Sequence, residues 1–499
     1  MKKLLFVAVV LSLLSCKDII KGFDDALSGN SNTRNFWAIN TANASPSFYE
    51  LQASRLVQNS RCEIWAEKGS GITDAQAKKI ADEYSNGIYP KMMSNFGFID
   101  ESGNDVIDYA HLIATGKDQG GKLTILLLDI QDGYVEGSTD GTIVAGYFWP
   151  YDIFTNVPAS SKTNKCAMLY IDINPRKPES DFFFETIAHE MQHLINFTNR
   201  IMVALNNKEK TLYPTDTWID EGLSSAAEWV YSGKHLQYRL DNFNNDTTGL
   251  LKKGNNFFVW GNRSDEKSTA VLDDYSTAYL FFQWLRVQKS SDIYKKIISS
   301  NYYDYRAVTT EFGAVDWPSL LEKWLRANYD RSSSGEYGYG NDPTLNGIKR
   351  HFTPATSPQS AAVTLYPGEG VYSNASSFTV PSQSGNIKYL GLGSVSGSTI
   401  NSGALLTYNV NTTVNTYDAE GNLLSGPSSE SGKITGAAPP PNVNIIAPDS
   451  RSVSSGISSG PFPISVGDML RIRGSGIERN FTGVNPGLLT GAGKEAEDE

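Results

Sequence analysis

The chain has 499 residues and a formal charge of −11, with 43 lysines and arginines against 54 aspartates and glutamates. Its hydrophobic content of 40% and aromatic content of 11% suffice for a sizeable core, which excludes a wholly disordered protein. A chain of this length has room for about three domains. No clustered basic stripe follows the N-terminal Lys2-Lys3 pair, so we expect no nucleic-acid partner.

The first fifteen residues are typical of an export signal. Lys2-Lys3 precede an apolar run over residues 4–14, which is too short to cross a bilayer about 30 Å thick. The run ends in Leu14-Ser15-Cys16, which resembles a bacterial lipobox, although Leu14 is larger than the usual residue. We therefore expect cleavage of residues 1–15, a lipid on Cys16, and a membrane-anchored lipoprotein at the outer membrane, the cell surface or the periplasmic face. Ordinary secretion after cleavage nearby is the alternative.

Residues 16–35 have few large apolar side chains and are expected to form a tether. Once Cys16 is assigned to lipid, Cys62 and Cys166 are the remaining cysteines. In an exported chain this even remainder predicts one disulfide between them. Two separately buried thiols are the alternative, because the sequence does not show whether the two Cα atoms approach within about 7 Å.

Residues 36–175 are predicted to form the N-terminal, β-rich part of a catalytic unit. Hydrophobic runs indicate strands at 62–66, 123–130 and 168–173, and a helical pattern covers 73–96. Residues 176–350 are predicted to form its helical part. The periodicity there indicates helices at 182–196, 217–231, 276–288 and 317–328.

The composition changes after Trp324, the last of nine tryptophans. Residues 355–475 are rich in Ser, Gly, Thr and Asn and contain short alternating runs, which predicts a C-terminal all-β, sandwich-like domain. The predicted strands are 377–380, 387–390, 405–410 and 469–472. Residues 476–499 are expected to be a flexible acidic tail.

The segment His189-Glu190-Met191-Gln192-His193 indicates a metal site. On a helix of 3.6 residues per turn, His189 and His193 share one face, so both imidazoles can bind one ion. Glu190 lies about 100° around the helix, beside the ion, where its carboxylate can accept a proton from metal-bound water. Apolar residues on the opposite face would fix the helix to the core.

A second helix pattern, WIDEGLSSAAEW over residues 218–229, supplies carboxylates on one side. A catalytic zinc with one open position needs three protein ligands, and a carboxylate from a neighbouring helix can be the third. We predict that Glu221 is this ligand. Glu228, two turns later on the same face, is predicted to accept a hydrogen bond from a ligand imidazole, and the alternative is a solvated carboxylate.

Taken together, HEMQH and WIDEG resemble the gluzincin metallopeptidases, and the chain is most similar to the hyicolysin-like neutral metallopeptidases, peptidase family M30. Other supporting stretches are FWAINT, KLTILLLDI, GTIVAGYFWPYD, MLYIDINP and YSTAYLFFQWL, which together cover about residues 35–328. The resemblance implies an α+β zincin catalytic domain that binds one Zn²⁺ through His189, His193 and Glu221, with Glu190 as the catalytic carboxylate.

Two departures from the gluzincin pattern affect the expected function. Ser225 occupies the place where some gluzincins carry an Asp four residues after the Glu ligand. The Gly-x-Met-Glu-Asn strand that aminopeptidase gluzincins use to hold a substrate amino terminus is absent from the sequence. We therefore expect cleavage within chains rather than from their ends.

Tyr275-Ser276-Thr277-Ala278-Tyr279 resembles the start of the tyrosine-bearing helix that follows the Glu ligand in other gluzincins. The correspondence implies that Tyr275 donates a hydrogen bond to the oxyanion formed from the peptide carbonyl. Tyr279 is its nearest competitor, and the alternative is that both tyrosines simply pack beside the core. His111, His235 and His351 follow no ligand spacing and are expected to be ordinary histidines.

The sequence therefore predicts a zinc-dependent endopeptidase that hydrolyses protein or peptide substrates outside the cytoplasm. The rival hypothesis is a lipid-anchored surface adhesin or binding protein on an inactive metallopeptidase scaffold. An intact ligand set together with Glu190 is more than such a scaffold requires, which favours the enzyme.

Overall fold

A computed structural model gives the fold over most of the chain. It describes residues 32–40, 42, 47–98, 105–106, 122–134, 144–153, 162–175, 177–207, 211–212, 215–246, 248–254, 271–360, 362–383 and 385–412. It also describes four short strands at 416–417, 423–425, 442–445 and 464–465. No helix among these residues is both long enough and apolar enough to cross a membrane. The predicted signal, Cys16, the predicted tether up to residue 31 and the acidic tail lie outside the described residues. The end of the predicted tether is wrong, because residues 33–35 already belong to the first β-strand.

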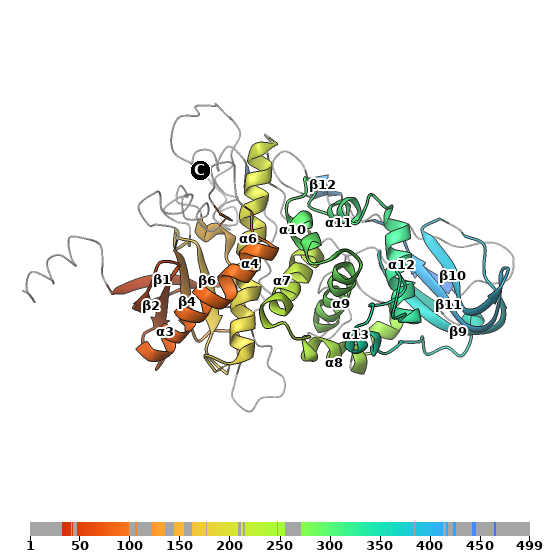
Figure 1. Ribbon diagram of the computed structural model, residues 1–499, viewed down its shortest axis with the longest axis horizontal. Helices are drawn as coiled ribbons and strands as arrows, with labels where there is room; N and C mark the ends of the chain where they lie inside the picture. The colour runs from red at the N-terminus through yellow and green to blue at the C-terminus, as the bar shows by residue number, and fades with distance from the viewer. Residues whose placement is uncertain are drawn as a thin grey trace, which may run out of the picture.

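A six-stranded mixed sheet forms the N-terminal part, in the order β1-β2-β3-β4-β6-β5 (Figure 1). Strands β3, β4 and β6 run parallel, and the others pair antiparallel to their neighbours. The bounds are β1 Thr33–Asn40, β2 Ser47–Gln58, β3 Cys62–Glu67, β4 Leu123–Leu128, β5 Gly146–Tyr147 and β6 Met168–Asp172. The three parallel strands are the ones that the hydrophobic runs predict, because a strand buried on both faces has a continuous apolar sequence.

The two faces of this sheet bury different cores. On β4, Ile125 and Leu127 face the helices, whereas Leu126 and Leu128 face the hairpin of β1 and β2. The helix face is covered by α3 Asp74–Glu83, α4 Tyr89–Asn95 and α6 Asp181–Asn206. Between α3 and α4 the predicted single helix contains a π-helical turn at Tyr84–Ile88. The turn ends two residues before Pro90, which has no N–H to continue the helix ladder.

The predicted disulfide is wrong, since Cys62 and Cys166 are both free and buried. Cys62 packs in the core on the helix face, with its Sγ 4.0 Å from the carbonyl oxygen of Ala81. Cys166 packs in the core under the β1–β2 hairpin, with its Sγ 3.7 Å from Arg34 Nη1. The sheet thus separates the two thiols, and each behaves as a small apolar core residue.

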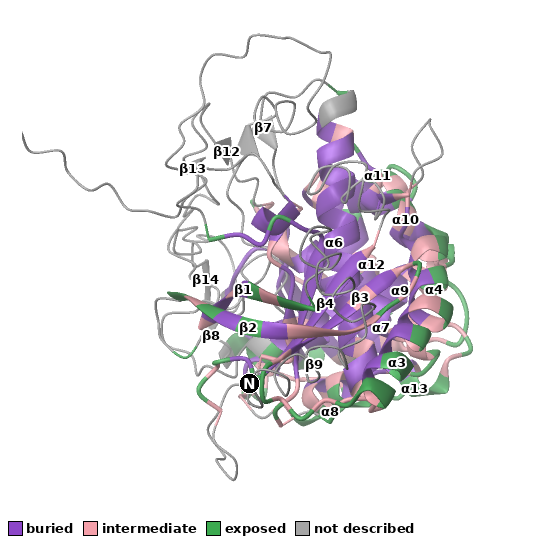
Figure 2. Cartoon of the chain, turned by 90° about the vertical axis from the view of Figure 1, so that its left-hand side faces the viewer, coloured by how far each residue is buried: buried purple, intermediate pink, exposed green. Residues whose placement is uncertain are grey.

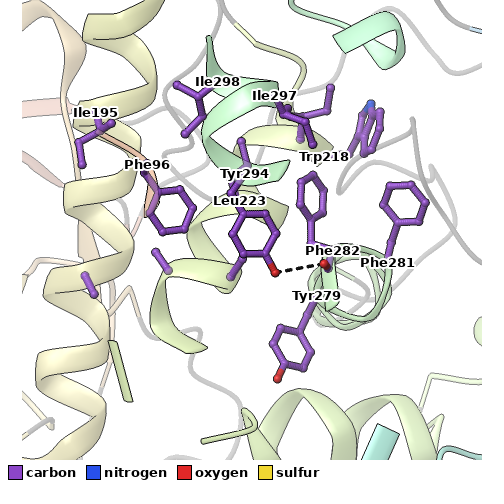
Figure 3. Packing of buried hydrophobic residues seen from close by; sticks show 14 of the residues in the cluster. Phe96, Ile195, Trp218, Leu223, Tyr279, Phe281, Phe282, Tyr294, Ile297 and Ile298 are labelled. Atoms are coloured by element: carbon purple, nitrogen blue, oxygen red, sulfur yellow. Dashed lines mark hydrogen bonds between the residues drawn. The ribbon is translucent and has the colours of Figure 1, made fainter. Parts of the chain in front are cut away.

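The helical part follows α6 and has one continuous core with it (Figure 2). Helix α7 packs against α6, and α9 packs against α7. The ring of Trp218 on α7 lies 6.3 Å from that of Phe282 on α9, measured between centroids. In Figure 3 the hydroxyl of Tyr294 on α10 donates to the carbonyl oxygen of Phe282 at 3.1 Å. The helix bounds are α7 Thr217–Ser232, α8 Gln237–Asn245, α9 Val271–Lys289, α10 Asp292–Ile298, α11 Tyr305–Glu311, α12 Trp317–Asp330 and α13 Pro343–Asn346.

A separate antiparallel sheet follows α12, in the order β10-β11-β9 (Figure 1). Its strands are β9 Gly370–Thr379, β10 Ile387–Ser396 and β11 Thr399–Asn409. One face packs on α12, where the Tyr372 hydroxyl donates to the Leu325 carbonyl oxygen at 2.5 Å. The other face has its own small core. The short strands are β7 Thr211–Leu212, β8 Ala362–Leu365, β12 Thr416–Tyr417, β13 Leu423–Ser425, β14 Asn442–Ile445 and β15 Ile464–Ser465. A second, all-β unit is therefore confirmed, and the predicted strand at 469–472 lies outside the described residues.

Candidate metal centre

Helix α6 presents both predicted histidine ligands on one face. The rings of His189 and His193 are 4.9 Å apart between centroids, and the side chains are buried. On the back of the helix, four apolar residues are buried in the main core, namely Phe183, Ile187, Met191 and Leu194. The apolar face thus fixes the orientation of α6, and the two imidazoles point away from the core that holds it.

Helix α7 brings Glu221 to the same point. Its Oε2 lies 3.3 Å from His189 Nε2 and 3.6 Å from His193 Nε2, and Glu221 is 2% exposed. His189, His193 and Glu221 together could hold a metal ion. Among the described residues, no other group of His, Cys, Asp and Glu side chains is arranged in this way.

The donor set fits zinc. Zinc bonds of about 2.0–2.2 Å in a tetrahedral site place the donor atoms about 3.4 Å apart, close to the separations found here. The Glu221 Oε2 is buried without a hydrogen-bond partner, as expected for an oxygen that serves a metal.

The second nitrogen of each histidine has an acidic partner. His189 Nδ1 lies 2.8 Å from Glu228 Oε1, the contact predicted from the sequence. His193 Nδ1 lies 2.9 Å from Asp220 Oδ2 and 3.1 Å from Ser224 Oγ. An imidazole that donates through Nδ1 keeps its Nε2 lone pair free, so these contacts orient both Nε2 atoms for a metal.

The sequence did not identify Asp220 as part of the site. Asp220 is 4% exposed, and its Oδ1 accepts a hydrogen bond of 2.5 Å from Asn196 Nδ2. The Asn196 side-chain oxygen in turn accepts from Thr215 Oγ1 at 3.1 Å. An acidic residue directly before the ligand Glu221 was the available signal, but a helical pattern alone does not show that both consecutive carboxylates can reach one histidine.

The two histidines and the acidic residues around them shift one another's pKa values. Burial alone would lower the pKa of His189, but the carboxylates of Glu221 and Glu228 raise it to about 9. The His193 pKa is also raised, because Asp220 and Glu221 outweigh the effect of burial. Burial alone would raise the pKa of Glu221, but the two imidazoles bring this pKa well below its usual range. A cation is therefore favoured at this point, and a metal would have to displace protons from the two rings.

Glu190 faces the edge strand β5. A Cβ atom on Gly146 would lie 3.2 Å from Glu190 Cγ and 3.0 Å from Thr186 Cγ2, so glycine allows the strand to lie directly on α6. Burial raises the pKa of Glu190, while the charges of His189 and His193 act in the opposite direction. A carboxylate with a raised pKa holds a proton more readily, as a group that accepts and returns one must.

Tyr275 lies beside the residues that could hold a metal. Its ring centroid is 6.5 Å from that of His189, and its hydroxyl hydrogen-bonds Glu221. Helix α9 can come this close because Gly222 has no side chain, and a Cβ there would collide with the Phe282 ring. Tyr279 is used elsewhere, since its hydroxyl lies 3.0 Å from His235 Nδ1 and accepts from the Leu236 N–H at 3.2 Å.

Three further polar residues named from the sequence are Ser225, His235 and His351. Ser225 is buried, and its Oγ has no hydrogen-bond partner. His235 Nε2 lies 2.7 Å from Asp342 Oδ2, and His351 packs against the Phe243 ring at 5.2 Å. His111 lies outside the described residues.

Comparison with known proteins agrees with these motifs. The chain is 28% identical over 358 residues to a neutral metalloprotease, ShpI, from Staphylococcus hyicus. The alignment covers 68% of this chain and 74% of the relative. No family model matches the chain. The resemblance to the hyicolysin-like metallopeptidases is thereby confirmed, and the chain is homologous to a metallopeptidase.

Proposed function

We propose that this homologue of a neutral metalloprotease is a zinc-dependent endopeptidase of gluzincin fold. The observation that carries the proposal is the convergence of His189 Nε2, His193 Nε2 and Glu221 Oε2 on one point, with Glu190 on the same helix as the histidines. The homology supports the metallopeptidase class. Cleavage within chains is favoured because the sequence lacks the amino-terminus-binding strand of the aminopeptidase gluzincins.

Bound zinc would polarise the peptide carbonyl and lower the pKa of water toward about 7. His189, His193 and Glu221 would hold it, and Glu228 and Asp220 would keep the two rings oriented. Glu190 accepts a proton from the attacking water on its carboxylate and then returns that proton to the leaving amine. Tyr275 donates its hydroxyl proton in a hydrogen bond to the carbonyl oxygen as negative charge develops there.

The test is to incubate the purified protein with a denatured protein, with and without a chelator, and to sequence the fragments. Internal cuts that the chelator abolishes and added zinc restores would support the proposal. Release of terminal residues only would contradict an endopeptidase. A protein that holds zinc and cleaves nothing would favour the surface-binding alternative.

The proposed location is the membrane surface outside the cytoplasm, through a lipid on Cys16. Support comes from the short apolar run and the lipobox-like sequence that precedes this cysteine. Cys16→Ala should move the protein out of the membrane fraction or block its maturation. Unchanged membrane partitioning of that variant would contradict a lipid anchor at Cys16.

A further inference from the structure

Arg239, on α8, lies between two aromatic rings at the metal centre. Its guanidinium carbon is 4.2 Å from the centroid of the Tyr275 ring and 4.8 Å from that of Tyr238. The Tyr275 hydroxyl hydrogen-bonds Glu221, and the Tyr238 hydroxyl donates to Glu228, the partner of His189. Stacking on both rings thus fixes the guanidinium beside the residues that hold the metal.

The hydrogen-bond donors of Arg239 are not used within the described part of the chain. The guanidinium makes no hydrogen bond or ion pair there, and its Nε is buried without a partner. Arginines stacked on tyrosines elsewhere do have acceptors. Arg326, over Tyr337, lies 2.8 Å from Asp330, and Arg350, over Tyr329, donates to the carbonyl oxygen of that tyrosine at 2.6 Å.

A buried donor without an acceptor is costly, and such groups in native proteins ordinarily have a partner. The partner needed here is a hydrogen-bond acceptor rather than a counter-charge, because the carboxylates of Glu228 and Glu221 already act on this guanidinium. Tyr238 is 37% exposed, so one of the two stacked rings faces solvent. Arg239 itself is half-buried rather than fully enclosed, so a peptide that approaches the metal centre can reach it.

We propose that Arg239 is a substrate-binding residue whose guanidinium donates hydrogen bonds to a main-chain carbonyl oxygen of the bound peptide, next to the bond that is cut. This inference rests on the proposed function. In this arrangement Arg239 aligns the peptide along α8 and α9, and Tyr275 donates to the carbonyl oxygen of the bond that is cut. A planar guanidinium with several donors suits an oxygen acceptor better than a lysine ammonium would.

Peptide binding is best measured in the Glu190→Gln background, which prevents turnover. The probe is a fluorescent peptide with an acetylated amino terminus and an amidated carboxyl terminus, cut by the parent enzyme, and the readout is fluorescence anisotropy. Arg239→Ala should raise the Kd of this peptide by about tenfold, and Arg239→Lys should raise it less. Zinc content and far-ultraviolet circular dichroism should not change. Arg326→Ala is the matched control and should leave the Kd unchanged.

In enzymes with Glu190 intact, Arg239→Ala should raise KM about tenfold with a much smaller effect on kcat. An unchanged Kd would overturn the inference. A fall in kcat alone would contradict substrate binding by Arg239 and would show that it only positions the Tyr275 ring. A loss confined to a matched peptide with a free carboxyl terminus would show a carboxylate site instead. A parent enzyme that cuts no peptide would contradict the proposed function itself, whereas an active parent with an unaffected Arg239 variant would contradict this inference alone.

Discussion

Asp220 holds the ring of His193, with its Oδ2 2.9 Å from the imidazole Nδ1. The next residue, Glu221, reaches the other nitrogen of the same ring, with its Oε2 3.6 Å from Nε2. Two consecutive carboxylates on α7 therefore contact one histidine from its two sides. One of them orients the ring, and the other is placed to share a metal with it.

This arrangement predicts a ranking of zinc affinities. Glu221→Ala should reduce zinc occupancy steeply, because it removes a ligand. Asp220→Ala and Glu228→Ala should each weaken zinc binding by about tenfold to a hundredfold, because only the orientation of a ring is lost. Competition with a chromogenic chelator measures the affinities, and Asp292→Ala, at an exposed position on α10, is the control. A larger loss for Glu228→Ala than for Glu221→Ala would make Glu228 the third ligand.

Tyr275→Phe should lower turnover by roughly a hundredfold with zinc content unchanged, because a donor to the developing oxyanion is lost. Tyr279→Phe is the matched control on the same helix. Its hydroxyl serves Leu236 and His235, so that variant should lose stability but keep its turnover. Full activity of Tyr275→Phe would show that this tyrosine only packs beside the ligands.

Gly146→Ala should lower turnover by about tenfold or more through a displaced Glu190, since small shifts of a catalytic group are costly. The added Cβ would lie 3.2 Å from Glu190 Cγ, 3.0 Å from Thr186 Cγ2 and 2.9 Å from the Tyr170 carbonyl oxygen. Zinc occupancy should stay normal, because neither histidine is touched. Adding Thr186→Ser, which removes one of these contacts, should restore part of the activity. A fully active Gly146→Ala variant would contradict a close fit between β5 and Glu190.

Asp172, at the end of β6, should make stability depend on pH. Burial, with the charges of Asp132 and Asp129, raises its pKa to about 7, against about 3.9 in an unfolded chain. The native state therefore binds the extra proton, and stability falls as pH rises from about 4 to 7. Urea unfolding should show Asp172→Asn gaining stability relative to the unmodified protein over this range, by about 1–2 kcal/mol at pH 8. A difference between the two that does not vary with pH would contradict the raised pKa.

Much of the site could be predicted from the sequence because helical spacing determines which side chains share a face. The spacing of His189 and His193 and the DEG segment at residues 220–222 were sufficient for the three ligands that the structure brings together. The contact between Glu228 and His189 also followed from a spacing, seven residues after Glu221. Three of the sheet strands were visible as buried apolar runs.

Contacts between distant elements could not be predicted in this way. Helix α6 continues to Asn206, ten residues beyond the predicted end, because polar residues of its second half such as Arg200 are buried against the 298–300 segment. Cysteine parity suggested a disulfide, but nothing local shows that Cys62 and Cys166 lie on opposite faces of one sheet. The stacking of Arg239 between rings of α8 and α9 likewise depends on how those helices pack.

The most direct test of the metallopeptidase account is the Glu190→Gln variant, assayed for zinc content and for hydrolysis of a denatured protein in the same preparation. An amide keeps the shape of the side chain but cannot accept the proton of the attacking water. We predict one zinc per chain, as in the unmodified protein, and a loss of turnover of at least a hundredfold. A variant that retains zinc and cleaves at close to the normal rate would contradict the role of Glu190 and, with it, the proposed mechanism.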